Sequence, residues 1–336
     1  MNVSLYREPR QAAGKPAGRL GPLAILLLVA AASPVAAASD SPGPLQVQDQ
    51  RLLAIAEPIL ARNAPLCDRT MPDLGVALES LDQYPAKARP PFAAPVAFAQ
   101  VLPASAAAQA GIEPGDGLVS VDGRAIVQRP DLRASPLRDS AFAMLSDHPA
   151  GTPLTLGIVH AGERREVTIA ARQECRALAE ILDEKNGTDA RSDGRVIQIS
   201  YGLAVRASDE QIATIFAHEL AHAILHHRDR LAAADVSKGL LGELGRDRRL
   251  NLQAEEEADR LSVHLLANAG IDPRVAPAFW RSRLGRQLSG GLFHDRMHLS
   301  AKARAQMLDE EISTKLTGAL PSYPAELLAT RNQPMG

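Results

Sequence analysis

Aromatic residues are scarce in this chain of 336 residues, which has six Phe, four Tyr and one Trp. Single-stranded nucleic acids stack on aromatic side chains, so few binding platforms of that kind exist here. Charge of one sign is also lacking, because 37 Lys and Arg residues face 39 Asp and Glu residues. The formal net charge is −2, with no basic block. Nucleic acid is therefore not expected as a partner.

Long hydrophobic runs are missing except near the N-terminus. A membrane-spanning helix needs roughly 20 apolar residues, and no later stretch of the sequence approaches that length. The composition, 46% hydrophobic and 23% charged, is that of a globular protein rather than of a disordered one. At roughly 100–200 residues per domain, this length predicts two domains.

The first 38 residues have the pattern of an export signal. Basic residues lie between Arg7 and Arg19, an apolar core spans Leu23–Ala32, and small residues follow at Val35–Ala38. We therefore expect residues 1–38 to be a signal peptide and the mature protein, which has no transmembrane segment, to reach the periplasm. An uncleaved inner-membrane anchor is the alternative. No Cys follows the apolar core, so lipidation is not expected.

Cysteine is rare, with only Cys67 and Cys175 present. An even number of cysteines in an exported protein favours a disulfide between them. The alternative is two unrelated buried thiols. A zinc site built on cysteine is disfavoured, because two isolated Cys residues do not make a ligand set.

Residues 39–90 are expected to hold a linker and an N-terminal helical segment. Apolar residues recur at helical spacing in Gln50–Asn63, where Pro58 is expected to kink the helix or end it early. The Pro-rich segment 85–95 then indicates a domain boundary.

Residues 91–173 alternate short strands and turns. The order is a strand, a short helix stopped by Gly111, a turn, a second strand and a hairpin turn at Asp122-Gly123. With the string AGIEPGDGLVSVDG, this order resembles a PDZ domain of the kind attached to bacterial exported proteases. The resemblance implies peptide binding, although the expected carboxylate loop near Phe92–Ala97 lacks a glycine signature. Another small β-rich module is the alternative.

Residues 174–316 are mostly helical by pattern. A strand is expected at Arg195–Ser200, and Ser208 begins a helix that runs to about His227. Three more helices are expected at Asn251–Ala269, Pro273–Leu284 and Ser300–Lys315. Residues 317–336, rich in Pro and Gly, are expected to form a flexible tail.

The string HELAH carries the most specific chemical signal. His218 and His222 are four residues apart, so on a helix both imidazoles share one face and can hold one zinc ion. Glu219 lies beside them as the base for an attacking water, whose pKa zinc lowers to about 7. The apolar residues of this helix argue against a coincidental match, because unpartnered His and Glu side chains would cost free energy there.

A catalytic zinc site needs a third protein ligand. His226 is unsuitable, because it lies about 12 Å from His218 along a helix axis, and Arg228 stands where a metzincin would have its third His. The string AEEEADR offers Glu255, with Asp259 four residues later able to orient a ligand His from behind. Glu256 and Glu257 compete with Glu255 for the ligand role. The alternative for the whole run is an exposed acidic helix start.

HELAH followed by EEEAD resembles the gluzincin metallopeptidases related to HtpX, BepA and the CAAX prenyl proteases. The resemblance implies that Glu255 is the third zinc ligand, because it stands three residues before the Ala-Asp pair. It also implies that His298 and Arg304, six residues apart, approach the cleft as catalytic residues. Leu299 stands where the family usually has Pro.

We therefore expect an α+β protein, with a mainly helical zincin-type metallopeptidase domain that has a short edge-strand sheet, and a small β-rich PDZ domain. The expected function is an exported endopeptidase with one zinc per chain that cleaves envelope proteins in quality control. A substrate peptide would add to an edge strand near Val196–Ser200, and His298 or Arg304 would stabilise the oxyanion. The alternatives are a zinc-containing chaperone or scaffold with little proteolysis, and a lipoprotein-like assembly factor. The sequence does not fix the oligomeric state.

Overall fold

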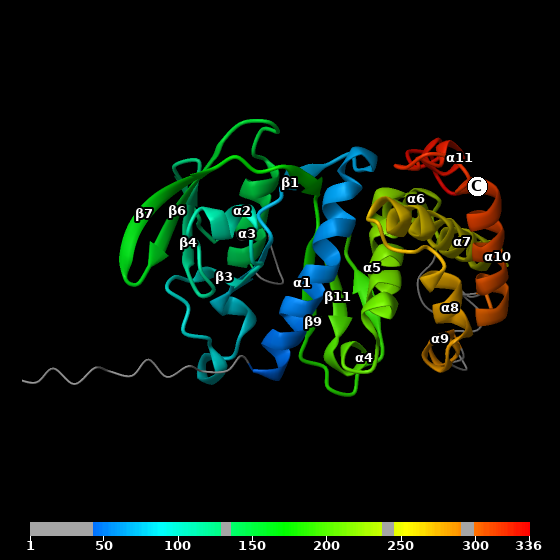
Figure 1. The fold of residues 1–336 in the computed structure, drawn as a ribbon, viewed down its shortest axis with the longest axis horizontal. Helices are drawn as coiled ribbons and strands as arrows, with labels where there is room; N and C mark the ends of the chain where they lie inside the picture. The colour runs from blue at the N-terminus through cyan, green and yellow to red at the C-terminus, as the bar shows by residue number, and fades with distance from the viewer. Residues whose placement is uncertain (1–42, 129–135, 237–244, 290–298) are drawn as a thin grey trace, which may run out of the picture. The chain divides into compact units, whose positions relative to one another are not determined.

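The computed structural model describes residues 43–128, 136–236, 245–289 and 299–336. The predicted signal peptide at 1–38 and His298 lie outside the described residues. Within them the fold is α+β, as expected (Figure 1). It has two large hydrophobic cores. In the part of the chain that the structure describes, no helix combines the length and apolarity needed to cross a membrane.

One core lies against an antiparallel sheet with strand order β2-β3-β4-β6-β7, in which β5 also pairs with β4. The strands are β2 (Val76–Ser80), β3 (Val96–Val101), β4 (Gly117–Val121), β5 (Arg124–Ala125), β6 (Leu154–His160) and β7 (Glu163–Ile169). Two helices, α2 (Ala106–Gln109) and α3 (Pro136–Ser146), belong to the same unit, which we call the β-rich module. Phe98 and Phe142 are fully buried in its core.

The β-rich module begins before residue 91, the predicted boundary. Strand β2 forms an edge of its sheet and pairs with β3. The Pro-rich segment is therefore a loop that connects two paired strands rather than a domain boundary. The loop leading into this edge strand is Leu74-Gly75 rather than Phe92–Ala97. Gly75 has a φ of +65°, and a Cβ atom there would lie 2.5 Å from the Ser105 Cβ. Both the backbone conformation and the close contact therefore require glycine.

The long helix α1 (Pro44–Arg62) leads into the second core. It does not end at Pro58, because buried residues before and after the proline, Leu52 and Ile59 among them, anchor it to that core. Its Asp49 Oδ1 accepts a hydrogen bond of 2.9 Å from the Ile181 backbone N–H. Helix α1 thus packs on strand β9 (Leu178–Leu182).

Contacts also join β9 to the β-rich module. Glu180 Oε1 accepts hydrogen bonds from Arg138 of α3 at 2.8 Å and from Gln83 at 2.7 Å. The side chain of Leu178 packs against the core of the β-rich module. Strand β9 therefore lies between the two cores and contacts both of them.

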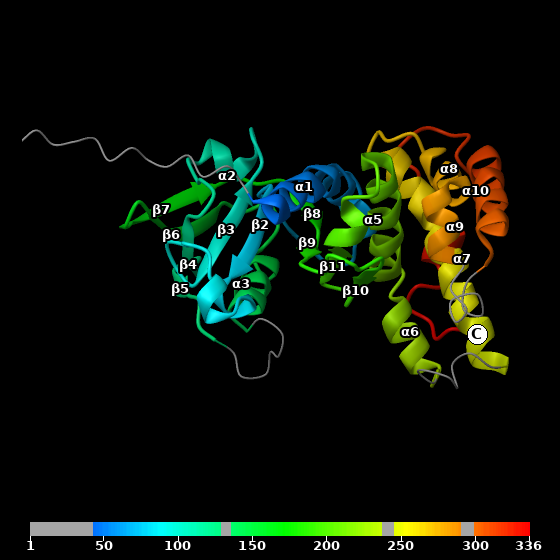
Figure 2. The same ribbon diagram turned by 90° about the horizontal axis from the view of Figure 1, so that it is seen from below.

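The second core is formed mainly by helices. They are α4 (Tyr201–Ala204), α5 (Asp209–Ile224), α6 (His227–Ala233), α7 (Gly245–Asn268), α8 (Val275–Arg281), α9 (Arg283–Ser289), α10 (Ala301–Lys315) and α11 (Ala325–Leu328). With β9 and the strands that pair with it, they form what we call the helical module. Helices α5 and α7 lie side by side (Figure 2). Phe216 of α5 and Leu261 of α7 are buried in this core.

The three-stranded sheet of the helical module has the order β10-β11-β9. Strand β11 (Val196–Ser200) matches the predicted strand but is not an edge strand, because it pairs with β9 in parallel and with β10 antiparallel. Strand β10 (Ala190–Ser192) is the edge instead. A peptide therefore cannot pair with Val196–Ser200, whose two sides are already occupied.

Cys67 and Cys175 form the expected disulfide, with Cα atoms 5.5 Å apart. Beside it, β1 (Thr70–Pro72) pairs antiparallel with β8 (Gln173–Cys175). The bridge closes a loop that contains most of the β-rich module, since its two cysteines are 108 residues apart in sequence.

The C-terminal residues 317–336 pack against the protein rather than forming a flexible tail. Leu327 and Met335 are buried. The Gln333 carbonyl accepts a hydrogen bond of 3.0 Å from Arg230 Nε, and Arg331 NH1 donates to the Leu66 carbonyl at 2.7 Å. Apolar anchors and hydrogen bonds hold this segment although its composition is rich in Pro.

Candidate metal centre

Helix α5 positions both histidines of the HELAH string. It starts with a capping box, in which Ser208 Oγ accepts from the Gln211 backbone N–H and Gln211 Oε1 accepts from the Ser208 N–H. Its apolar residues, including Ile212 and Phe216, are buried. Because that face is fixed in the core, His218 and His222 point together toward α7.

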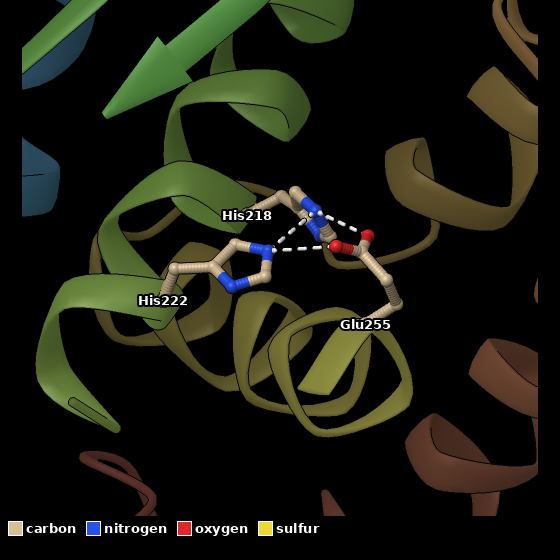
Figure 3. A group of neighbouring side chains, drawn as sticks. All are labelled: His218, His222 and Glu255. Carbon is tan, nitrogen blue, oxygen red and sulfur yellow. Dashed lines mark hydrogen bonds and ion pairs between the residues drawn. The ribbon is translucent and has the colours of Figure 1, made fainter. Parts of the chain in front are cut away.

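Glu255 reaches the two histidines from α7. The Nε2 atoms of His218 and His222 lie 3.1 Å apart. The carboxylate of Glu255 lies 3.3 Å from His218 Nε2 through Oε2 and 3.5 Å from His222 Nε2 through Oε1. Figure 3 shows the three side chains converging on one point between α5 and α7.

These separations fit a tetrahedral zinc ion. Ligand bonds of about 2.0–2.1 Å in a tetrahedron place the ligand atoms roughly 3.3 Å apart. The three separations given above, between 3.1 and 3.5 Å, bracket this value. Two imidazoles and one carboxylate also form the His₂Glu set that catalytic zinc sites use, with a fourth position left for water or substrate.

The protonation of the two histidines differs. Burial lowers the pKa of His222 to about 3, so this imidazole is neutral, which is the form that ligates a metal. Burial acts in the same direction on His218, but hydrogen bonds to Asp259 and Glu255 outweigh it and raise its pKa to about 10. The carboxylates that attract a proton to His218 attract a metal cation for the same reason.

Glu219 lies with the three converging side chains on the wall of a large cleft. The cleft has a volume of about 1030 Å³ and includes His218, His222 and Glu255 in its lining. Glu219 is half-buried there. It thus lines the cleft beside the three residues of the candidate metal centre.

Asp259 lies behind His218. Its Oδ1 is 3.0 Å from His218 Nδ1, the contact that an orienting role requires. Burial acts to raise the pKa of Asp259, but Arg304 and His218 outweigh it and lower the pKa. Asp259 is therefore a buried anion that fixes the ring of His218.

Arg304, on α10, donates to both carboxylate oxygens of Asp259 through Nε and NH2, at 2.5 Å each. Its guanidinium carbon lies 3.5 Å from the ring centroid of Trp280, and the residue is buried. These contacts indicate that Arg304 positions Asp259. Its action on an oxyanion, and that of His298, which lies outside the described residues, stay predictions.

His227 is a site residue that the sequence did not assign. Its Nδ1 lies 2.8 Å from His222 Nδ1, and its Nε2 lies 3.2 Å from Glu257 Oε2. Burial opposes ionisation of Glu257, but His227, Arg230 and Gln253 outweigh it and lower its pKa to about 2. Glu257 is thus engaged behind His222, and the structure brings Glu255 rather than Glu257 to the two ligand nitrogens.

Comparison with known proteins gives two similarities. A family model described as PDZ domain matches residues 98–135. Over 137 residues, the chain is 29% identical to the mitochondrial metalloendopeptidase OMA1 of Arabidopsis thaliana. That match covers 34% of this chain and 27% of the relative.

These similarities support a protease with a PDZ module. The metalloprotease relative implies a metal, and the His218, His222 and Glu255 group is present to hold one. A PDZ domain implies peptide binding. The β-rich module contains the matched residues that the structure describes, so we refer to it as the PDZ module below.

Proposed function

We propose that this protein is an exported zinc-dependent endopeptidase that hydrolyses peptide bonds of envelope proteins, in quality control of the periplasm. The convergence of His218, His222 and Glu255 beside Glu219, in a cleft open to substrate, carries the proposal. The signal-like pattern of residues 1–38 supports export.

The chemistry divides among these residues. His218, His222 and Glu255 would hold zinc, which when bound polarises a peptide carbonyl and lowers the pKa of water. The carboxylate of Glu219 accepts the proton of the attacking water and passes it to the leaving amine. Asp259 and His227 keep the two imidazoles in the orientation that ligation needs.

The substrate backbone would add to β10 (Ala190–Ser192). This strand is the edge of its sheet, and its residues line the cleft with His218 and Glu219. An extended peptide paired with β10 would lie along the cleft, with main-chain hydrogen bonds giving affinity independent of sequence. The PDZ module would bind a second extended segment of substrate or partner.

The test is hydrolysis of an unfolded protein by three variants loaded with zinc. Glu219→Gln should keep zinc and lose about 10²–10⁴-fold in rate, as expected for a missing general base. His222→Ala should lose both zinc and activity. Glu210→Gln, an exposed acid in the first turn of the same helix, serves as the control and should match the wild type. Wild-type activity in Glu219→Gln would contradict the role of Glu219 as the base, and no hydrolysis by the zinc-loaded wild type would leave only a scaffold role.

A further inference from the structure

Arg69 and Arg176 are held side by side next to the disulfide. Arg69 follows Cys67 by two residues and Arg176 directly follows Cys175. The Arg176 backbone N–H donates to the Arg69 carbonyl at 3.1 Å, and Thr70 lies opposite Cys175 in the β1–β8 pair. The disulfide and the strand pairing therefore fix the backbones of Arg69 and Arg176 next to each other.

Both arginines line the same cleft as the candidate metal centre. The guanidinium carbon of Arg176 lies 4.7 Å from the ring centroid of Phe142, and the residue is half-buried. Stacking on an aromatic ring restricts the side chain and leaves its N–H donors free to bind at the guanidinium edge. A peptide lying along β10 would pass through this same cleft.

The charges of this pair are not neutralised locally. Among residues 43–128, 136–236, 245–289 and 299–336, no carboxylate forms an ion pair with Arg69 or Arg176. The charges of Asp147 and Asp193 act to raise the pKa of Arg176, but neither acid forms an ion pair with it. Asp193 pairs with Arg195 at 3.1 Å, and Asp68 pairs with Arg331.

Two like charges close together are unfavourable, and here Arg176 is half-buried while Arg69 is exposed. Burial first, and then the nearby charges of Arg69 and Arg195, lower the pKa of Arg176. An anion bound between the guanidinium groups relieves that repulsion, and arginine binds carboxylates through two parallel N–H donors. The cleft therefore has a place for one negative group from outside.

We propose that Arg69 and Arg176 form a carboxylate-binding subsite that selects peptides with a negative group on one side of the scissile bond. The proposal rests on the proposed peptidase function and names its substrate class. The carboxylate can come from an Asp or Glu side chain or from the C-terminus of the peptide. Both sources offer the same planar anion to the arginine pair.

The experiment measures kcat/KM for matched peptides with full-length, zinc-loaded enzyme. One pair of peptides differs by Glu or Gln at a single position, scanned on both sides of the cleavage site. A second pair differs only in a free or amidated C-terminus. We expect the charged peptide of at least one pair to be favoured by about 10- to 100-fold, the usual effect of a charge-assisted hydrogen bond. A preference in the first pair assigns the side chain, and one in the second assigns the C-terminus.

Two arginine variants connect this preference to the subsite. Arg176→Gln and Arg69→Gln should each abolish the preference, so that kcat/KM becomes equal for the charged and the neutral peptide. Arg228→Gln is the matched control, because Arg228 lines the same cleft but already donates to the Asp193 carbonyl at 2.9 Å. Thermal unfolding of each variant checks that it folds. If Arg176→Gln is unstable, Arg176→Lys takes its place. It keeps the charge and should retain part of the preference.

The two proposals fail in different ways. Equal kcat/KM for charged and neutral peptides, or a preference that survives both arginine variants, would overturn the subsite and leave the peptidase intact. If no peptide is cleaved, the proposed function fails. Binding of the same peptides to Glu219→Gln then tests the subsite alone, and equal affinity for charged and neutral peptides would overturn it.

Discussion

The imidazole of His227 lies against that of His222, with their Nδ1 atoms 2.8 Å apart. For His222 to ligate through Nε2, its Nδ1 must carry the proton and donate to His227. His227 then carries its own proton on Nε2, which faces Glu257 Oε2 at 3.2 Å. Arg230 NH1 donates to the same oxygen at 2.6 Å, so a buried series of contacts fixes the tautomer of a predicted ligand.

This relationship predicts that His227→Ala weakens zinc binding by about 10- to 100-fold, the usual cost of losing the partner behind a ligand. His227→Asn, whose Oδ1 can stand where Nδ1 accepts, should recover part of the affinity. Competition with a chromophoric chelator measures both constants. Wild-type affinity in His227→Ala would show that the contact does not support ligation.

Arg304→Ala should destabilise the fold, because it removes the arginine that pairs with the buried carboxylate of Asp259. Breaking a buried ion pair costs about 3–5 kcal/mol. Arg281→Ala is the matched control, since Arg281 forms an exposed pair with Asp309 and should cost about 1 kcal/mol or less. Urea denaturation compares the two.

The same variant separates two roles of Arg304. If it positions His218 through Asp259, Arg304→Ala should lower zinc affinity as well as turnover. If it acts on the oxyanion, turnover should fall by about 10²–10³ with zinc affinity unchanged. The sequence alone predicts the second outcome, and the contacts of the guanidinium favour the first.

Asp49 should make stability depend on pH. Burial raises its pKa to about 7, whereas an Asp in the unfolded chain has a pKa of about 3.9. The folded state binds the proton more tightly, so this group's contribution to stability is full below about pH 4 and is lost as the pH rises to about 7. One such group changes the free energy of unfolding by at most about 1.4 kcal/mol per pH unit.

Asp49→Asn imitates the protonated acid and keeps an acceptor for the Ile181 N–H. Its stability relative to the wild type should therefore increase between pH 5 and pH 8. Urea denaturation at both pH values gives the difference. The comparison is between variant and wild type because burial also raises the pKa of Glu79, which acts in the same direction. A constant difference would show that Asp49 titrates normally.

The disulfide should contribute substantially to stability. Closing a loop of 108 residues lowers the entropy of the unfolded chain. In the chain-entropy model this raises the free energy of unfolding by about 5 kcal/mol. The double variant with Cys67→Ser and Cys175→Ser should lose most of this, and a reducing agent should destabilise the wild type alone. Two free thiols in the exported protein, detected by mass analysis without reduction, would contradict the bridge.

Local sequence signals anticipated much of the candidate site. Ser208 at the start of α5 and the four-residue spacing of His218 and His222 are properties of one helix, readable from neighbouring residues. Glu255 came from a family resemblance, and the structure brings it to the two histidines. Their role as zinc ligands stays a prediction.

The features that the sequence did not predict depend on contacts between segments that are far apart in the chain or joined by a sharp turn. His227 was expected at a helix end, but His226 adopts a left-handed conformation with φ 53°, and the chain turns so that His227 packs on His222. The position of β11 in the middle of its sheet depends on β10, a three-residue strand too short to give a pattern. Residues 317–336 are held in place by hydrogen bonds to residues of other segments, such as Arg230 and Leu66.

The zinc content of two neighbouring glutamate variants tests the central claim most directly. The account predicts about one zinc per chain in the wild type and in Glu256→Gln, and strongly reduced zinc in Glu255→Gln, because a three-ligand site cannot lose one ligand. Elemental analysis of the purified, dialysed proteins gives the three values. Full zinc in Glu255→Gln, or none in the wild type after zinc loading, would contradict the metal centre and the peptidase built on it.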